Sequence, residues 1–587
     1  MRSALIAATL LVALSSAAAV KWYAVDPMGE TPYMPDKAPK GGIEGGTLWI
    51  VAAKGEYEPC SVVLVSDQDL GKVKVELGDL RNENGDVFPK ANLDLKTVKV
   101  WYQCGNAWTS YFADPGLRLC PELLLNDEDL IKVDTKKVGN YARLTEKDGT
   151  VRYQWITAPN PLDNRNEGID RWGWRLPTAF CCMKPNFADA PTHAGVTLDK
   201  GVHKQLFITA NVGKGTKAGL YKGEVKVRGE GEQWSVPLVL RVLDFELPEP
   251  KCYFDVEKDF NTWFCEYVGL DFCKSMNGGD EQLAERQLVA ILSDFVRHGE
   301  ILPGYRETAT RPELGLEAGM VFDDRSMSVC SSCQLVGGTR AEMRYDARRK
   351  REALEKKYGP GNYYCGWGDE YGLHVLKCIR DMVKIYHDEG FRFPINSGAG
   401  YDAAGYLADV WWPPVSPDGR SSASTFKYNQ LGGDGYFGWY ACQHVGNENP
   451  AFNRRQYGFG PYRAGLSCNF NYAHHLQEWN DIGTDYYKPM MFVYGIYGGC
   501  VDTLQWEGFR EGLDDIRYAT LLKQLAQPLV KGTADQRYAA KKALQLLADA
   551  DGDDMDLTTL RYEMIRHIEK LRGLAVERLS EEKAAKN

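Results

Sequence analysis

The sequence predicts a multidomain protein of α and β structure, with an N-terminal β-sandwich, then a (β/α)8-type barrel, then a C-terminal helical tail. Three observations predict this order. Short segments with alternating apolar residues fill residues 46–247, and strand-like and helix-like segments alternate after residue 250. After about residue 516, apolar residues recur at the 3.6-residue spacing of helices. A chain of 587 residues is also long enough for more than one domain.

The N-terminal residues have the organisation of a secretory signal peptide. Arg2 supplies a positive charge, residues 4–14 (ALIAATLLVAL) are apolar, and Ala17-Ala18-Ala19 offers small side chains for cleavage. The apolar run is too short to cross a bilayer. We therefore expect residues 1–19 to be a signal peptide, no later segment to span a membrane, and the mature protein to be exported to the periplasm or the extracellular space. The alternative is a buried N-terminal helix.

Residues 20–247 are expected to form the β-sandwich domain. The segments CSVVLVS (60–66), HKQLFITANV (203–212) and SVPLVLRVLDF (235–245) are examples of its strands, and turn residues separate them. Residues 140–200 are rich in Asn, Pro and Trp and predict a long irregular loop. The sequence Leu247-Pro248-Glu249-Pro250 marks the end of the domain.

Residues 248–525 are expected to form the barrel, and residues 526–587 the C-terminal helical segment. Residues 281–298 have helical apolar spacing and end at Gly299, and further helices are predicted at 342–358 and 371–389. Strands alternating with helices over this length predict a parallel barrel. The candidate strands are 254–260, 362–370, 391–398, 409–413, 435–443 and 465–472.

Charge and composition exclude several classes of partner. The formal net charge is −10, which argues against nucleic acid and anionic membranes. The 9 His form no HExxH motif, and Cys330-Ser-Ser-Cys333 has no second pair at zinc-binding spacing among the 15 Cys. No metal and no organic cofactor is therefore expected. Aromatic residues reach 12%, which suits sugar binding, although most such rings belong to cores.

The candidate catalytic residues are the adjacent acids Asp369 and Glu370. They follow Cys365-Gly366-Trp367-Gly368 between a predicted strand and a predicted helix. In a barrel this junction lies at the carboxyl ends of the strands, where active sites are built. Two neighbouring carboxyl groups push their pKa values apart, so that one stays protonated as an acid and the other stays ionised. The alternative is that both acids only stabilise the start of the helix.

Four features resemble glycoside hydrolase family 123, the exo-β-N-acetylgalactosaminidases and their relatives. The first is Asp369-Glu370, which is similar to the catalytic pair of that family. The other three are Gly55-Glu56-Tyr57-Glu58-Pro59; the two sandwich segments Pro121-Glu122-Leu123-Leu124-Leu125 and Ala218-Gly219-Leu220-Tyr221-Lys222-Gly223; and the closing segment Trp506-Glu507-Gly508-Phe509-Arg510-Glu511-Gly512-Leu513-Asp514-Asp515. The resemblance covers most of residues 45–525 and is most specific in the closing segment.

The resemblance implies a retaining hydrolase in which the 2-acetamido group of the sugar is the nucleophile. It assigns Asp369 to the acetamido N–H and Glu370 to the glycosidic oxygen, as acid and then as base. It also implies substrate contacts from Trp439 and Tyr440, a Trp-Tyr pair that could equally belong to the barrel core. Further substrate-binding candidates at the rim are Trp367, Asn469, Asn471 and Tyr472.

Departures from the family pattern leave the sugar open. Tyr371 follows the acidic pair where family members often have Pro, and Trp506-Glu507 replaces the common start of the closing segment. The expected partner is a glycan carrying terminal β-linked N-acetylgalactosamine or a related 2-acetamido sugar. Two alternatives stay open: a glycosidase of other specificity with a separate carboxylate such as Glu266 or Asp434, and a carbohydrate-binding surface protein without activity.

Overall fold

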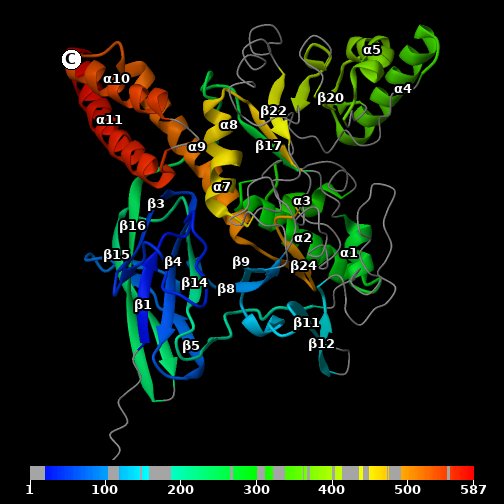
Figure 1. Cartoon of the computed structure of the whole chain (residues 1–587). Coiled ribbons are helices and arrows are strands. Elements are labelled where there is room, and N and C mark those ends of the chain that lie inside the picture. The colour runs from blue at the N-terminus through cyan, green and yellow to red at the C-terminus, as the bar shows by residue number, and fades with distance from the viewer. Residues whose placement is uncertain are drawn as a thin grey trace, which may run out of the picture.

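A computed structural model describes most of the chain (Figure 1). The described residues are 20–103, 118–145, 149–157, 187–229, 231–264, 269–299, 311–321, 337–360, 363–365, 370–398, 404–412, 435–440, 448–471, 474, 491–550 and 555–586. The predicted signal peptide, residues 1–19, lies outside this range. Among the described residues, no helix is both long enough and apolar enough to cross a membrane.

Two stacked sheets form the N-terminal module, in the blue-to-green part of Figure 1. The first sheet has the strand order β2-β1-β4-β14-β8-β9 and the second β13-β5-β15-β16-β3, with β6 and β7 attached to β15. In the first sheet the strands are β1 (Val20–Val25), β2 (Ile43–Glu44), β4 (Glu56–Ser66), β8 (Leu93–Gln103), β9 (Arg118–Leu125) and β14 (Lys204–Val212). In the second they are β3 (Leu48–Lys54), β5 (Gly71–Leu77), β6 (Leu80–Arg81), β7 (Val87–Phe88), β13 (Val196–Leu198), β15 (Gly219–Gly229) and β16 (Glu232–Glu246).

The sandwich core explains why these segments are strands. Alternate residues of β16, such as Val236, Leu238 and Leu240, are fully buried and pack in one cluster with Val62 and Leu64 of β4. Pro237 and Arg241, on the other face of β16, are exposed, as the period of two predicts, whereas Val239 on that face is buried. The sandwich prediction is confirmed in its strands.

A third sheet replaces the irregular loop that was expected in part of residues 140–200. Its antiparallel strands are β10 (Ile131–Asp134), β11 (Gly139–Thr145) and β12 (Val151–Trp155). The prediction of a loop was wrong for residues 140–145 in β11, for β12 and for β13 (Val196–Leu198). Strand β12 is short and largely exposed, so no apolar alternation marks it. The 3₁₀ helices η1 (Lys90–Asn92) and η2 (Glu128–Leu130) complete the module.

Parallel strands follow, each close to where the sequence predicts one. They are β17 (Asn261–Phe264), β18 (Tyr363–Tyr364), β19 (Phe391–Arg392), β20 (Pro394–Asn396), β21 (Val410–Trp412), β22 (Tyr436–Tyr440) and β23 (Cys468–Asn471). The strand expected at 254–260 is absent, and β17 begins directly after it. Five strands pair in the order β17-β23-β22-β21-β20, and β18 pairs with β19, which leads directly into β20.

This order and direction of the strands is what a barrel would require. Consecutive strands lie side by side without reversal, and the first strand, β17, lies beside the last, β23. The described strands leave the space between β17 and β18 open, so closure of the barrel stays a prediction. Helices accompany the strands: α1 (Leu270–Met276), α2 (Glu281–Arg297), α3 (Pro312–Ala318), α4 (Arg340–Tyr358), α5 (Leu373–Asp388), α7 (Pro450–Arg454), the π-helix η6 (Arg455–Phe459) and α8 (Gly460–Arg463).

The C-terminal helices are α9 (Leu504–Leu529), α10 (Ala534–Asp549) and α11 (Leu557–Lys586), after the hairpin β24 (Tyr494–Ile496) and β25 (Gly499–Val501). Helix α9 runs unbroken through residue 525, where the sequence suggested a division. Residues of α10 and α11, such as Ala540 and Leu560, belong to the same buried cluster as Phe509 of α9 and Phe437 of β22. The tail therefore shares its core with the parallel sheet.

Candidate functional site

The carboxyl ends of the parallel strands form what we call the strand-end rim. Side chains on the two faces of this sheet belong to different clusters. Phe437 and Trp411 pack with the helices, whereas Trp412, Phe470 and Tyr364 form a separate cluster on the opposite face. Because neighbouring residues of a strand alternate between faces, the second cluster lies on the face turned away from the helices, the interior of the predicted barrel.

Aromatic rings fill this interior face near the strand ends. Trp263 lies edge-on to Trp412 with 5.9 Å between ring centroids, and Trp412 stacks on Phe470 at 4.2 Å. Tyr440 is half-buried and its ring lies 5.5 Å from that of Phe470. Trp263, Trp412 and Phe470 are fully buried, so of these four rings Tyr440 alone is partly accessible to a sugar.

Glu370 lies at the rim, in the loop after β18, and its side chain is exposed. Its φ is 50°, and Val138 is the other non-glycine residue with a positive φ in the described part of the chain. This left-handed conformation costs about 1–2 kcal/mol for a residue with a side chain. The next residue is held by the neighbouring strand, because Tyr371 donates its N–H to the carbonyl of Asn396 at 3.3 Å and accepts a bond from the Ser397 hydroxyl. Strain of this kind is commonly retained where it positions a functional group.

Some of the other candidate residues lie outside the described part of the chain, and the rest lie on different faces of the sheet. Asp369, Trp367 and Tyr472 lie outside the described residues, and so does the side chain of Trp439, although its backbone pairs with Asn469 of β23. Asn469 is buried and donates its amide to the carbonyl of Tyr457 in the helical layer. Among the described residues, then, Glu370 and Tyr440 share the rim, whereas Asn469 faces the helices.

Asn471 ends β23 and is 1% exposed. Neither its side-chain oxygen nor its nitrogen has a hydrogen-bond partner among the described residues. A buried primary amide without partners costs free energy, so it is a natural acceptor and donor for a bound polar ligand. Strand alternation places it on the same side as Asn469.

Glu370 and Tyr440 are separated by strands β20 and β21. Three strand spacings of about 4.8 Å put roughly 14 Å between their positions along the sheet. In a flat sheet this distance is too long for one small sugar, whereas the curvature of a closed barrel brings such positions toward a common mouth. The single pocket predicted from the sequence thus depends on closure.

Three of the segments that carry the family resemblance, residues 55–59, 121–125 and 506–515, meet elsewhere, around α9. Residues 219–223 belong instead to β15 of the second sheet. Asp515 accepts two bonds from Arg454, at 2.7 and 2.9 Å, and one from Arg561 of α11 at 2.7 Å. Arg561 also bonds Glu58 of β4 at 2.8 Å and Glu511 at 2.6 Å. Together with Glu56, these residues are named the α9 junction. They connect the sandwich, the parallel-sheet domain and the C-terminal helix.

Glu56 completes the α9 junction. Its carboxylate accepts the N–H of Ala53 at 2.6 Å and the Tyr518 hydroxyl at 2.7 Å. Burial, followed by the negative charge of Asp514, raises the pKa of Glu56 to about 8. The Pro121–Leu125 segment joins α9 in the same way, because Gln505 donates to the buried Glu122 at 2.6 Å. These segments therefore hold the domains together.

The glycines of the closing segment have a packing role. A Cβ at Gly512 would lie 2.5 Å from the carbonyl oxygen of Arg454, and one at Gly508 would lie 2.2 Å from that of Pro450. Helices α7 and α9 therefore pack backbone against backbone at these two glycines. Arg510, Asp514 and Asp515 of the same segment are buried and ion-paired, which is a structural role.

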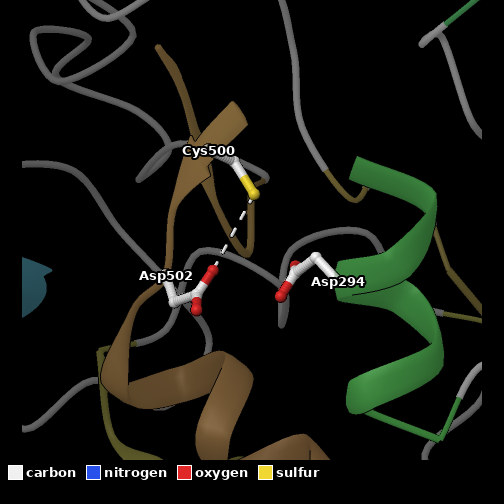
Figure 2. Close-up of side chains that lie close together, drawn as sticks. All are labelled: Asp294, Cys500 and Asp502. Carbon is white, nitrogen blue, oxygen red and sulfur yellow. Dashed lines mark hydrogen bonds between the residues drawn. The ribbon is translucent and has the colours of Figure 1, made fainter. Parts of the chain in front are cut away.

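A second polar cluster surrounds the start of α9 (Figure 2). Asp294 of α2 accepts bonds from Arg297 and from the indole N–H of Trp506, both at 3.0 Å, and lies 3.4 Å from His474, which follows β23. Burial alone would raise the pKa of Asp294, but the charge of His298 and hydrogen bonds from His298 and His474 hold it well below its ordinary value. Asp294 is thus a buried anion surrounded by donors.

Figure 2 also shows Cys500 and Asp502 beside Asp294. The ligand atoms of these three residues lie within 4.8 Å of one another, as do those of His298, Asp502 and Glu507. Burial and then the charge of Asp294 raise the pKa of Asp502 to about 7, whereas Asp294 itself raises the pKa of His298, against burial, to about 9.

The donor types would suit a divalent metal, but cations already occupy the places next to the acids. Arg297 and His298 face Asp294, and Arg510 pairs with Glu507. The cluster is therefore described as an ion-pair network that ties α2 and His474 to the start of α9.

Sequence reasoning missed the aromatic residues of the interior face. Trp263 was not noticed, and Trp412 was treated only as part of a strand. The sequence did show that Trp411 and Trp412, as neighbours on a strand, point to opposite faces of the sheet. Trp412 shares its face with Val410. Both faces of such a strand are buried, so the sequence does not tell which one is the interior.

The similarity of this chain to known proteins lies in its fold. Neither a scan of protein-family models nor a search of curated sequences gave a match. Among solved structures, a family 123 glycoside hydrolase from Clostridium perfringens, described in a study of glycolipid glycan hydrolysis, matches with a TM-score of 0.60 at 12% identity, over 97% of this chain and 100% of that one. The resemblance to family 123 is thus confirmed at the level of the fold.

Two other solved structures are more distant. β-Glucuronidase 3 of Bacteroides uniformis matches with a TM-score of 0.27 at 9% identity, over 81% of this chain and 51% of that one. A GH10 xylanase with a bacterial Ig-like domain, from termite gut, matches with a TM-score of 0.25 at 8% identity, over 55% of this chain and 91% of that one. At such TM-scores neither contributes to the functional conclusion.

Proposed function

We propose that the chain is an exported, retaining glycoside hydrolase that releases terminal β-linked N-acetylgalactosamine, or a related 2-acetamido sugar, by substrate-assisted catalysis. The observation that carries the proposal is the end-to-end structural match to a family 123 glycoside hydrolase. The position of Glu370, exposed and in a left-handed conformation at the strand-end rim, adds to it.

The proposed reaction has two steps. The oxygen of the 2-acetamido group attacks C1, the bond from C1 to the glycosidic oxygen breaks, and Glu370 gives its proton to that oxygen. Asp369 accepts the acetamido N–H and stabilises the positive oxazolinium ring. A water molecule then attacks C1, the bond from C1 to the acetamido oxygen breaks, and Glu370 takes the proton of the water. Each step inverts C1, so the anomeric configuration is retained overall. No carboxylate of the enzyme needs to reach C1, which distinguishes this route from the usual two-carboxylate geometry.

The rim supplies the rest of the proposed site. A closed barrel brings Tyr440 opposite Glu370, where its hydroxyl can donate to the acetamido oxygen. Phe470 packs against the ring of Tyr440, and Trp412 stacks on Phe470, so buried rings support Tyr440 from behind. Export follows in the proposal from the signal peptide at residues 1–19.

A substrate panel tests the proposal. Aryl β-glycosides of N-acetylgalactosamine, N-acetylglucosamine and galactose differ only in the 2-substituent or the C4 configuration. We expect hydrolysis of one or both acetamido sugars, none of the galactoside, and inhibition by the thiazoline analogue of the cleaved sugar. Cleavage of the galactoside without thiazoline inhibition would instead indicate a separate carboxylate nucleophile. Glycan binding without any cleavage would indicate a non-catalytic protein.

A further inference from the structure

A groove of about 570 Å³ opens at one edge of the β-sandwich, away from the strand-end rim. It lies where both sheets have a free edge. In one sheet, β13 pairs with β5 only over Gly71–Val73, so residues 74–77 have no described neighbour on that side. In the other, β14 covers one side of residues 93–96 of β8, but β9 pairs with β8 only from Thr97 onward, so the other side has no described neighbour. Its size is within the range of small-ligand sites.

Cationic side chains surround this groove, on a chain whose net charge is −10. Lys74, Lys90, Lys226 and Arg228 line it, against two acids, Glu76 and Asp94. Glu76 is already shared by Lys74 and Arg228, at 3.2 and 3.1 Å. Because such exposed ion pairs contribute little free energy, these cations can turn to another anion at small cost.

Ion pairs with neighbouring residues leave an excess of positive charge around the groove. Asp94 lies 3.5 Å from Lys96, and Lys226 lies 3.1 Å from Glu224. Counting these neighbours, five cations face three acids. Lys90, at the start of the short η1 helix, is exposed and has no anionic partner within ion-pair distance among the described residues.

The remaining lining combines aliphatic and neutral polar residues. Val75, Leu77, Leu93, Leu95 and Pro191 are the apolar ones, and Gly78, Asn126, Thr192 and His193 complete the lining. No Phe, Tyr or Trp is among the described lining residues. A neutral sugar would lack its usual stacking partner here, so charge has to supply the affinity and the exposed strand edges the hydrogen bonds.

We propose that this groove binds an anionic saccharide, through sulfate or carboxylate groups, and so holds the substrate chain whose terminal sugar is cleaved at the strand-end rim. The inference rests on the proposed function for the role of the bound chain, but binding itself is measured independently of hydrolysis. The ligand class follows from the excess of cations, the free strand edges and the lack of Phe, Tyr and Trp among the described lining residues.

Binding is measured by calorimetry with three tetrasaccharide probes that each contain 2-acetamido sugars: chondroitin sulfate, unsulfated chondroitin and neutral chitin fragments. The Glu370→Gln protein is used, so that no probe is consumed. We expect chondroitin sulfate to bind more tightly than the unsulfated probe, the neutral probe to be at least tenfold weaker, and affinity to fall between 50 and 300 mM salt. Equal binding of sulfated and unsulfated probes would assign recognition to the carboxylates.

The groove variant is Lys90→Glu/Lys226→Glu, and the matched control is Lys136→Glu/Lys222→Glu, which makes the same charge change at exposed positions outside the groove. The groove variant is expected to lose about tenfold or more in affinity, and the control less than threefold. Equal losses in both, or equal binding of an oligonucleotide of matched charge, would overturn the proposal. Tight binding by wild type with no cleavage of any aryl glycoside would reject the proposed function and leave the groove standing.

Discussion

The α9 junction and the strand-end rim treat acidic residues in opposite ways. At the junction, Asp515 and Glu511 are buried and each is bonded to an arginine. At the rim, Glu370 is exposed on a strained backbone. The segments most specific for the family resemblance are mostly at the junction. Segments that identify a family can therefore be those that hold the domains together. The proposed chemistry depends instead on a single short loop.

The largest expected effect is on the stability of the junction. Arg561→Met removes the arginine that bonds Glu58 and Glu511, and one of the two arginines that bond Asp515. The buried acids of the junction then face less positive charge. We expect a loss of about 3–5 kcal/mol in the free energy of unfolding, measured by denaturant titration. The control is Arg566→Met on the same helix, whose exposed pair with Glu563 should contribute less than about 1 kcal/mol. Equal losses in the two variants would refute the assigned role of the junction.

The close contact of α7 and α9 gives a second test. Gly512→Ala places a methyl group 2.5 Å from the Arg454 carbonyl oxygen, and we expect a loss of about 3 kcal/mol, seen as a lower melting temperature. Gly573→Ala in α11 is the matched control, since nothing lies near its Cβ. It should raise stability by about 0.5–1 kcal/mol. A Gly512→Ala protein as stable as wild type would show that the helices are not packed this closely.

The raised pKa of Glu56 predicts a pH effect. Folding raises this pKa from 4.5 to about 8, mainly through burial. The folded protein thus keeps a proton that the unfolded chain releases, and the stabilisation it brings is lost as pH rises toward 8. Glu56→Gln keeps both acceptor bonds without a charge. Its stability relative to wild type should rise between pH 5 and pH 8 by on the order of 1–3 kcal/mol, whereas the exposed Glu83→Gln should follow wild type.

The smallest expected effect separates the two faces of the parallel sheet. Tyr440→Phe should lower kcat/KM about tenfold, through loss of one hydrogen bond to the acetamido group, with little change in melting temperature. Asn469→Leu should do the reverse, because its amide bonds the helical layer. Kinetics and thermal melts of both variants decide this, and an Asn469 effect confined to kcat/KM would place it in the site instead.

Much of the fold follows from local pattern. The strands β4, β14 and β16 are visible as apolar alternation, and α2 and α4 begin at the capping residues Asp280 and Thr339. Strand β12 was missed because Val151 and Tyr153 are exposed, so its alternation carries no core signal. Apolar spacing and capping residues extend over only a few residues, and strands and helices are determined over the same short range.

The site and the junction were harder to predict because they depend on contacts between distant residues. Arg454 and Arg561 converge on Asp515 from 61 and 46 residues away, and no local pattern records this. Glu370 was found through its position after a strand, but its left-handed backbone was not foreseen, since glutamate rarely adopts it. Which of Trp411 and Trp412 faces the interior needed the register of β21 against β20 and β22.

The most direct test of the account is the turnover number of Glu370→Gln on the aryl 2-acetamido glycoside that wild type cleaves. The control is Asp381→Asn, an exposed acid on α5 after the same loop. The account predicts that kcat falls at least about 100-fold in Glu370→Gln, with a melting temperature equal to wild type, and is unchanged in the control. Full turnover by Glu370→Gln would contradict it.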